Sequence, residues 1–383
     1  METIEFAVVG AGVHGVSAAY HLARRGLRPH LFDRGAVAGG PTGRSSAICR
    51  AHYTNPFLAA VARESIDLFA QAGTWLGEPG AYRQTGVLFL HPQSDLAQVE
   101  RTVPMLREVG TDALLLDRQE IADRWPALLL DDIAAGVYEP RAGCADPVLT
   151  TTALHRRAVE MGVVSHLHTE VLRLTPLSRG GAVLETSDGE VACERVLVAA
   201  GPWTCSLLEP AGIHLPLHAE RHVVATFAWP SDMSLDVCIA DLPGGYYLRP
   251  EGSSLFSVGP LDPSPACNPD DVLNGIADDE VLSLGAALAR RAPVLESAGL
   301  QGGWASLYDV SPDWQPVIGE VSPGIVVDAG TSGHGFKLAP ALGRHVAALL
   351  CGETVPGLEQ FHPDRFATGA TLAAGYGSAR ILG

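Results

Sequence analysis

The chain has 383 residues, which is long enough for two domains of ordinary size or for one large two-part fold. Hydrophobic residues make up 47% and charged residues 18%, a composition typical of a globular protein with a large core and not of a disordered chain. Lysine and arginine total 26 against 43 acidic residues, and the resulting formal net charge of −17 disfavours nucleic acid and anionic membrane surfaces as partners.

The apolar stretches and the cysteines indicate the compartment. The most apolar segments, such as residues 6–9 and 346–350, are too short to span a bilayer, and the first residues lack the basic and apolar regions of a secretory signal. The seven cysteines are scattered, odd in number and without a C-x-x-C motif, which is typical of reduced thiols. We therefore expect a cytoplasmic protein with no membrane partner.

The chain begins with a strand–helix–strand unit. Residues 4–9 predict a short buried strand, residues 10–15 form a glycine-rich turn, and a helical pattern then extends to Gly26, a natural C-cap. Residues 30–33 predict a second strand that ends in an acidic residue.

The remaining elements follow from the same periodicities. Helices are predicted at residues 54–76, 95–109, 118–124, 146–161 and 277–291. Strands are predicted at residues 84–90, 163–167, 170–176, 181–186 and 190–199, and antiparallel strands at residues 217–227, 236–240, 245–249, 254–259 and 301–308. The chain closes with a strand at residues 324–329, a glycine-rich turn at residues 330–335, a helix at residues 336–351 and a loose tail from residue 366.

The order of these elements predicts an α/β fold of two parts. Segments with the α/β pattern lie at the start, middle and end of the chain, and β-rich segments lie between them. We expect a discontinuous Rossmann-like nucleotide-binding domain with an inserted α+β substrate domain built on an antiparallel sheet. The predicted nucleotide-binding domain comprises residues 1–81, 146–214 and 316–365, the substrate domain residues 82–145 and 215–315, and the tail residues 366–383.

The first glycine-rich turn has the G-x-G-x-x-G spacing of a dinucleotide site. Gly10 allows the tight turn, Gly12 lets the backbone approach a pyrophosphate, and Gly15 lets the helix pack close to the strand. Free N–H groups at the helix N-terminus attract the phosphates. Asp33, which follows Gly15 by 18 residues, stands where a carboxylate accepts hydrogen bonds from ribose hydroxyls. His14 is expected to pack or to face solvent, and the motif alone does not distinguish FAD from NAD.

Six segments, the glycine-rich turn included, extend the pattern over most of the chain. They are residues 8–15, 43–53, 199–203, 245–250, 308–319 and 330–337. Together they resemble the D-amino-acid oxidase superfamily of FAD enzymes, and in particular its sarcosine oxidase and glycine oxidase-like branch. The resemblance covers about residues 1–365 and implies the split architecture, FAD as the cofactor and an activity on amines or amino acids.

The motif and the resemblance together imply the residues of the site. The implied catalytic residues are Arg50, Lys337, Tyr308 and Tyr247. The implied cofactor-binding residues are Gly10, Gly12, Val13, His14, Gly15, Asp33, Arg34, Thr42, Arg44, Ser45, Ser46, Val171, Ala200, Gly201, Trp203, Gly333, His334, Gly335, Phe336 and Lys337. No metal site is expected, because the fourteen histidines form no cluster with ligand spacing.

Two positive side chains are expected to hold a substrate carboxylate. A guanidinium forms two parallel hydrogen bonds with a carboxylate, and the resemblance assigns that role to Arg50. Lys337 follows the glycines of residues 333–335, where backbone N–H groups suit the pyrimidine end of a flavin. Another arginine of the family pattern is replaced here by Ala47, which leaves the substrate open.

Two further departures concern the flavin. Members that bind flavin covalently carry a cysteine two residues before the tyrosine matched by Tyr308, whereas this chain has Ser306, and we therefore predict non-covalent FAD. Oxidases of the branch carry a lysine over the flavin that promotes the reaction with oxygen. The matching position lies at or beside Phe256, where no lysine occurs, so the electron acceptor is O2 or another acceptor.

The sequence thus predicts an FAD-dependent oxidoreductase that oxidises the C–N bond of an amino acid or a secondary amine, an N-methyl or cyclic amino acid for example, to an imine. Alternatives are a dehydrogenase with an acceptor other than oxygen, a subunit of a sarcosine oxidase-like complex, an NAD-dependent dehydrogenase and a non-catalytic flavin-binding protein. The expected partner is a small-molecule amine or amino acid, and the protein is a possible oligomer.

Overall fold

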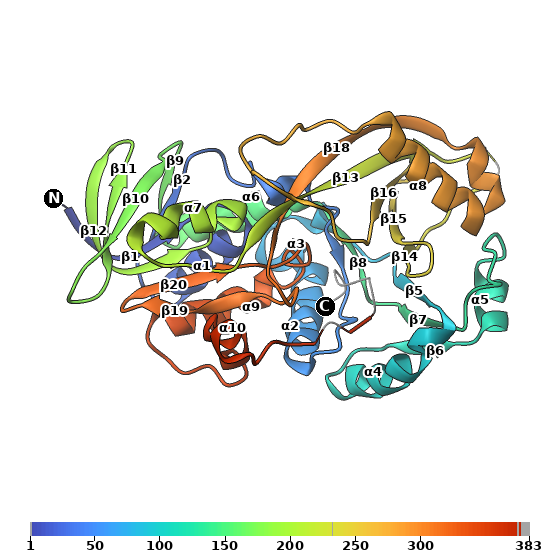
Figure 1. Cartoon of the computed structure of the whole chain (residues 1–383), viewed down its shortest axis with the longest axis horizontal. Helices are drawn as coiled ribbons and strands as arrows, with labels where there is room; N and C mark the ends of the chain where they lie inside the picture. The colour runs from blue at the N-terminus through green and yellow to red at the C-terminus, as the bar shows by residue number, and fades with distance from the viewer. Residues whose placement is uncertain (1, 232, 374, 377–383) are drawn as a thin grey trace.

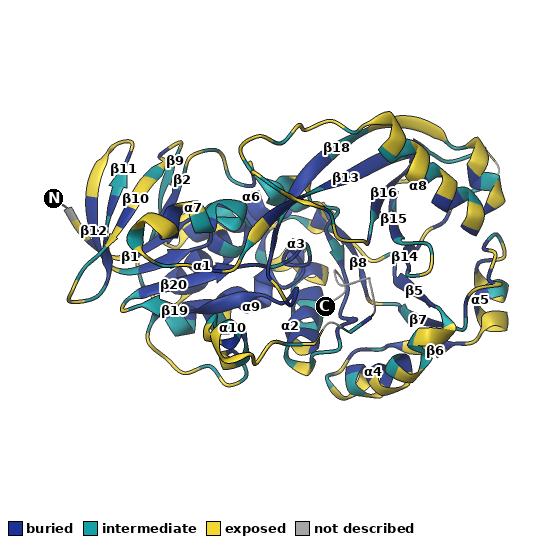
Figure 2. Cartoon of the chain, viewed as in Figure 1, coloured by how far each residue is buried: buried dark blue, intermediate teal, exposed yellow. Residues whose placement is uncertain are grey.

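The structure is a computed structural model that describes residues 2–231, 233–373 and 375–376. Two large sheets lie toward opposite ends of an elongated molecule, and the long strands β13 (His218–Ala228) and β18 (Gly299–Val310) of the second sheet extend toward the first (Figure 1). Both sheets are largely buried, and the exposed residues gather on the outer helical faces and at hairpin tips (Figure 2).

The first sheet has the parallel core that the sequence predicts. Its parallel strands are, in spatial order, β9 (Val164–Leu167), β2 (His30–Asp33), β1 (Glu2–Val9), β12 (Gly189–Val198) and β20 (Ile325–Ala329). Antiparallel strands extend it, namely β10 (Val171–Pro176), β11 (Ala182–Thr186) and β19 (Val317–Ser322).

Helices cover both faces of this sheet. Its helices are α1 (Val13–Arg24), α6 (Pro147–Glu160), α7 (Thr204–Leu208) and α9 (Ala339–Leu350). Helices α1 and α9 share one hydrophobic core with Val8 and Leu197, whereas Leu208 of α7 belongs to a separate core with Ala7 and Val198. This alternation of buried side chains along β1 and β12 is the signature of a sheet with helices on both faces.

The second sheet has nine strands and is mostly antiparallel. Its strands are, in order, β17 (Ala266–Cys267), β13, β16 (Leu255–Pro260), β15 (Tyr246–Glu251), β14 (Cys238–Asp241), β5 (Val87–His91), β7 (Ala135–Glu139) and β6 (Leu114–Leu116), and β18 pairs with β13. Helices α4 (Leu96–Glu108), α5 (Arg118–Arg124) and α8 (Asp278–Arg291) accompany it. Leu288 of α8 and Ile121 of α5 pack into the core of this sheet.

The remaining elements connect the two sheets. They are the small sheet of β3 (Ile48–Cys49), β8 (Gly143–Ala145) and β4 (Tyr82–Arg83), the helices α2 (Pro56–Ala70), α3 (Ala72–Trp75) and α10 (Asp364–Thr368), and the 3-10 helices η1 (Pro41–Arg44), η2 (Pro79–Ala81), η3 (Gln93–Asp95), η4 (Gly201–Trp203), η5 (Glu209–Ala211), η6 (Pro293–Ser297) and η7 (Glu359–Phe361). Strand β3 pairs with β8 across the predicted domain division, whose boundaries stay a prediction.

Two predictions about elements are wrong. The helix predicted at residues 54–76 is interrupted at Gln71, because the chain turns there and Trp75 Nε1 donates a hydrogen bond back to the Leu68 carbonyl at 2.7 Å. The segment after residue 366 is not a loose tail throughout, because α10 continues to Thr368 and Tyr376 is buried against His91. Residues 374 and 377–383 of the predicted tail lie outside the described residues. None of the helices that the structure describes has the length and hydropathy of a membrane span.

Candidate active site

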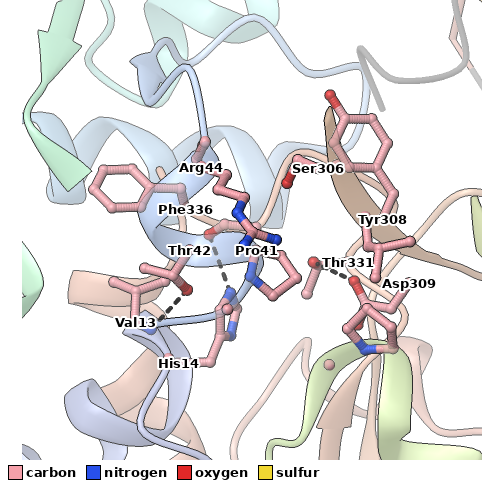
Figure 3. A pocket seen from close by; sticks show the side chains of 18 of the residues that line it. Val13, His14, Pro41, Thr42, Arg44, Ser306, Tyr308, Asp309, Thr331 and Phe336 are labelled. Atoms are coloured by element: carbon pink, nitrogen blue, oxygen red, sulfur yellow. Dashed lines mark hydrogen bonds between the residues drawn. The ribbon is translucent and has the colours of Figure 1, made fainter. Parts of the chain in front are cut away.

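A cavity of about 820 Å³ lies where the two sheets meet. The first sheet contributes the β1–α1 turn, the end of β2 and the turn of residues 333–337, and the second contributes β13, β15 and β18. The close-up in Figure 3 shows side chains from both parts facing one space, with Val13, His14 and Thr42 on one side and Ser306 and Tyr308 on the other.

Most of the predicted site residues lie in the wall of this cavity. They are Gly10, Gly12, Val13, His14, Asp33, Arg34, Thr42, Arg44, Ser45, Ser46, Arg50, Val171, Ala200, Gly201, Trp203, Tyr247, Tyr308, Gly333, Gly335, Phe336 and Lys337. Only Gly15 and His334 of the predicted set lie outside the wall.

The β1–α1 turn brings backbone to the edge of the cavity. Gly10 has a φ of +113°, and a Cβ atom there would lie 2.3 Å from the Ala199 carbonyl oxygen, so no larger residue fits. The N-cap residue Gly12 supplies no side-chain hydrogen bond, and Val13 N–H donates to Thr42 Oγ1 at 3.1 Å (Figure 3). The positive N-terminal end of α1 borders the cavity.

Gly15 acts through packing. A Cβ atom on Gly15 would lie 2.0 Å from the Gly10 carbonyl oxygen and 3.2 Å from Val8 Cγ1. The close approach of α1 to β1 therefore requires a glycine here, which is the role that the motif predicts.

Asp33 holds the turn together at the end of β2. Its Oδ2 accepts from Ala11 N–H at 2.6 Å and its Oδ1 accepts from Gly35 N–H at 2.7 Å. Beside it the Arg34 guanidinium lies over the Trp203 ring at 4.2 Å, and Trp203 Nε1 donates to Asp270 Oδ1 at 2.7 Å. A carboxylate with two acceptor oxygens, next to an aromatic ring and a guanidinium plane, suits a ribose and an adenine.

His14 is half-buried and hydrogen-bonded rather than fully exposed. Its Nδ1 lies 2.9 Å from Asp328 Oδ2 and its Nε2 lies 3.1 Å from the Gly335 carbonyl oxygen. Burial lowers the pKa of His14, but the nearby Asp328 carboxylate outweighs it and the net shift is upward. Asp328 Oδ1 is buried without a partner among the described residues and lies in the cavity wall, where a ligand hydroxyl would satisfy it.

Arg50 and Lys337 place two basic side chains in the same buried region. Arg50 Nη1 donates to the His52 carbonyl at 2.6 Å, and the guanidinium lies over the Tyr53 ring at 4.5 Å. Lys337 Nζ donates to the His334 carbonyl at 3.2 Å. Burial lowers the pKa of both groups, and the Arg50 charge lowers the pKa of Lys337 further. Lys337 is also the single lysine of the whole chain.

The tyrosines line the cavity beside these cations. Tyr247 hydroxyl and Ser46 Oγ lie 2.7 Å apart, and Tyr308 lines the same cavity. Tyr246 points to the other face of β15 and packs into the core of the second sheet, as the alternation of a strand requires. Apolar side chains complete this part of the wall, namely Val87, Phe89, Ile239 and Leu261.

The structure locates the two residues, Ser306 and Phe256, at which the sequence differs from the family pattern around the flavin. Ser306 lies in the cavity wall beside Tyr308 (Figure 3), and no cysteine occurs among the described residues of the wall. Phe256 lies in the core of the second sheet, with its ring centroid 4.1 Å from that of Trp229, and does not line the cavity.

His334 lies outside the cavity wall and holds neighbouring segments of the site together. Its Nε2 lies 2.8 Å from the Trp314 carbonyl and its Nδ1 lies 3.1 Å from the Tyr53 hydroxyl. The ring therefore links the turn of residues 333–337 to the segment that carries Arg50.

Sequence reasoning missed His222 and Glu220. His222 is buried in the cavity wall, and its Nε2 lies 3.0 Å from Glu220 Oε2. Both residues lie on a strand that the sequence predicts, two positions apart and therefore on one face. Two polar residues on one face of a predicted buried strand are unusual, and this pattern could have identified both as candidate site residues.

Comparisons with known proteins agree with this geometry. The family model described as DAO, FAD dependent oxidoreductase, matches residues 5–349. Monomeric sarcosine oxidase from Bacillus sp. (strain B-0618) is 26% identical over 94% of this chain and 95% of the relative. Mitochondrial dimethylglycine dehydrogenase from Homo sapiens is 25% identical over 99% of this chain and 47% of the relative.

Among solved structures, L-proline dehydrogenase from P. horikoshii superposes with a TM-score of 0.87 at 25% identity, covering 96% of this chain and 99% of that chain. The family match spans both sheets and every segment of the cavity wall. The chain therefore belongs to the DAO family of FAD-dependent oxidoreductases, whose cofactor is FAD.

Proposed function

We propose that the protein oxidises the C–N bond of an amino acid or a secondary amine that carries a free carboxylate. The observation that carries this proposal is the pair of buried basic side chains, Arg50 and Lys337, in a wall that also presents tyrosines and apolar groups. A carboxylate is the ligand group that two such side chains would hold.

The cavity fits FAD. The backbone cradle at Gly10 and Gly12 suits the pyrophosphate, and Asp33 lies where a ribose would bind. The buried, unpartnered Asp328 Oδ1 offers an acceptor to a cofactor hydroxyl. The turn of residues 333–337 would present its N–H groups to the pyrimidine end of the flavin.

The protein side chains would orient the substrate. Arg50 and Lys337 would fix the carboxylate, and Tyr247 and Tyr308 would confine the carbon that is oxidised between their rings. When bound, FAD supplies the two-electron acceptor for the C–H hydrogen of that carbon. Apolar side chains such as Phe89 and Ile239 would exclude water and favour a substrate with a small apolar substituent.

Relatives support the class of substrate. Their names include sarcosine, dimethylglycine and L-proline, which are all amines with a free carboxylate. An N-methyl or cyclic amino acid is accordingly our first choice of substrate.

A dehydrogenase that uses an acceptor other than O2 is the second candidate. The oxidase pattern has a lysine at or beside the position of Phe256, where this chain has none, and Phe256 does not line the cavity. An oxygen electrode and a dye assay on the same substrate would separate an oxidase from a dehydrogenase.

The experiment that tests the activity is anaerobic mixing of the FAD-loaded protein with sarcosine, N,N-dimethylglycine, L-proline and glycine, each compared with its decarboxylated amine. Bleaching of the flavin absorbance by an amino acid but not by its decarboxylated amine is the expected result. No bleaching by any amine of a wider panel would contradict the proposal.

Arg50→Ala should remove most of the discrimination between an acid and its decarboxylated amine. The loss of a charge-assisted clamp predicts a decrease in kcat/KM of about 30- to 1000-fold, or roughly 2–4 kcal/mol. Arg50→Lys should also be poor, because a point charge cannot reproduce the planar fork. FAD content, measured by absorbance, should stay normal; equal discrimination in the variant and the wild type would show that Arg50 does not hold the carboxylate.

A further inference from the structure

We propose that His222 takes the proton from the ammonium group of the substrate before oxidation, and that Glu220 positions His222 for this transfer. The inference rests on the proposed function and adds a proton acceptor to it.

His222 lies in the part of the wall that the tyrosines form. It is directly opposite Ser306 in the β13–β18 pairing, so both side chains share one face of the sheet. Its ring stacks on Tyr308 with centroids 3.9 Å apart and an interplanar angle of 19°. Tyr308 and Tyr247 line the same cavity as His222, which places His222 next to the residues assigned to the substrate.

The two ring nitrogens of His222 have different environments. Nε2 lies 3.0 Å from Glu220 Oε2, whereas Nδ1 is buried and has no partner among the described residues. A nitrogen that faces a carboxylate carries the hydrogen, and the neutral ring then has its lone pair on Nδ1. A buried lone pair without a donor is costly, and a donor in the cavity would satisfy it.

Glu220 is itself held in one orientation. Ser264 N–H donates to its Oε2 at 2.8 Å, and His218 Nε2 lies 2.9 Å from its Oε1. Burial raises the pKa of Glu220, but the hydrogen bonds with His222, Ser264 and His218 together outweigh burial and the net shift is downward. Glu220 is therefore a carboxylate at neutral pH, and it would stabilise the imidazolium that forms when His222 gains a proton.

The titratable groups around His222 come from three strands. Glu220 and His218 lie on β13 itself, Tyr308 faces it from β18, and Cys267 of β17 lies near Glu220. Arg221 alternates to the opposite face and pairs with Glu280 of α8. Glu220 is thus the charged group in direct contact with the His222 ring among the described residues.

The chemistry requires such an acceptor. An alkyl ammonium group has a pKa near 10 and no lone pair at neutral pH, so it cannot form an imine until it loses a proton. In the step proposed, the ammonium N–H bond breaks, the proton moves to His222 Nδ1, and the products are a neutral amine and an imidazolium paired with Glu220. No electrons are transferred in this step, and the proton returns to water after the product leaves.

The first test is the pH dependence of flavin reduction by the best amino acid of the panel, in rapid mixing under anaerobic conditions. At pH 7, His222→Gln should reduce the flavin about 100- to 1000-fold more slowly than the wild type. Its rate should rise toward the wild-type rate as the pH approaches 10, because the substrate then arrives as the neutral amine. His155→Gln is the matched control, since His155 bonds to Ser165 and lies outside the cavity wall.

Three further measurements distinguish a His222 that accepts a proton from a His222 that only supports the structure. Imidazole added to His222→Ala should restore part of the rate at pH 7, which a packing defect would not show. Glu220→Gln keeps the volume of the side chain and should lower the rate about tenfold, with an unchanged KM. Nitrogen-15 NMR of histidine-labelled wild-type protein should show hydrogen on Nε2 and none on Nδ1 of His222 at high pH.

The outcomes are distinguishable. Absence of flavin reduction in the wild type would overturn the proposed function. Reduction in the wild type with the same pH profile in His222→Gln, or hydrogen on Nδ1 in the NMR spectrum, would overturn the role of His222 and leave the proposed function standing. If His222→Gln does not fold, the profile of Glu220→Gln and the NMR tautomer decide the question.

Discussion

At the scale of single residues, burial controls the charge of the group that would meet the substrate. Lys337 is buried beside Arg50, and both effects lower its pKa well below the usual value for lysine. A bound carboxylate would have the opposite effect, because it stabilises the charged ammonium. Ligand binding should therefore change the protonation of this side chain.

Lys337 can be observed alone, because the chain has a single lysine. We predict that ε-¹³C-lysine labelling of the FAD-loaded protein gives one side-chain signal, which titrates at lower pH than that of a free lysine. Addition of a carboxylate ligand, such as acetate at high concentration, should shift the titration to higher pH. In Arg50→Ala the ligand-free titration should also move upward; a signal that titrates normally in all three samples would contradict the prediction.

The buried carboxyl group of Glu139 should make the stability of the folded protein depend on pH. Burial raises its pKa from 4.5 to about 7, although its Oε2 accepts from Ala51 N–H at 2.8 Å. The fold therefore favours the protonated carboxyl group. Its contribution to stability is fully present below about pH 4.5 and is lost as the pH rises through about 7.

Glu139→Gln should remove this dependence, since the amide oxygen can still accept from Ala51. We predict that the free energy of unfolding of the variant exceeds that of the wild type increasingly between pH 5 and 9, by at most about 3 kcal/mol. Urea denaturation at several pH values measures the difference. Parallel curves for the two proteins would mean that Glu139 does not titrate in this range.

At the scale of elements, one glycine fixes how close α9 lies to α1. A Cβ atom on Gly343 of α9 would lie 2.2 Å from Ser17 Oγ, and Ser17 Oγ also donates to the Ala339 carbonyl at 2.7 Å. Helix α9 follows the turn that carries Lys337, and α1 begins at the dinucleotide turn. The spacing of the two helices therefore sets the distance between the proposed pyrophosphate turn and the proposed flavin end of the cofactor site.

Gly343→Ala should lower the free energy of unfolding by about 1–3 kcal/mol and weaken FAD binding. Gly285→Ala is the matched control, because Gly285 lies inside α8 with no atom within 4 Å of an added Cβ atom. That control should stabilise the protein by up to about 1 kcal/mol through helix propensity. Urea denaturation and FAD titration measure both effects, and equal behaviour of the two variants would contradict the packing argument.

Local sequence patterns predicted those elements well whose structure depends on residues that are close in sequence. The strand at residues 30–33 and the helix at residues 118–124 match β2 and α5, the latter because Asp117 caps it with a capping box. Strand β19 was missed, since it forms only by pairing with β20. The burial of Tyr376 was also missed, because it depends on contacts with His52 and His91, which are distant in sequence.

The same distinction applies to the site. Gly10, Gly12 and Asp33 follow from the spacing of a motif, and their positions in the wall agree with it. The contact of His222 with Glu220 and Tyr308 depends on how β13 pairs with β18, which a single sequence does not specify. The roles of these residues stay predictions until they are measured.

At the scale of the whole molecule, the cofactor site joins the two sheets. The cavity takes Val9 and Ala199 from the first sheet and Val224 and Ala305 from the second. A ligand that fills this space contacts both sheets in the folded protein and neither in the unfolded chain. Its binding free energy therefore adds to the stability of the whole fold.

FAD should accordingly stabilise the protein without a covalent bond. We predict that Tm rises with FAD concentration, and that at 100 times Kd the folded state gains about 2.7 kcal/mol. Acid precipitation should release free FAD into the supernatant, because the wall presents the Ser306 hydroxyl and no thiol among its described residues. Differential scanning fluorimetry and the absorbance of the supernatant measure the two effects. A covalently attached flavin would stay with the pellet, and Tm would not change with added FAD. These two results together would contradict the prediction and show a covalent link through some other residue.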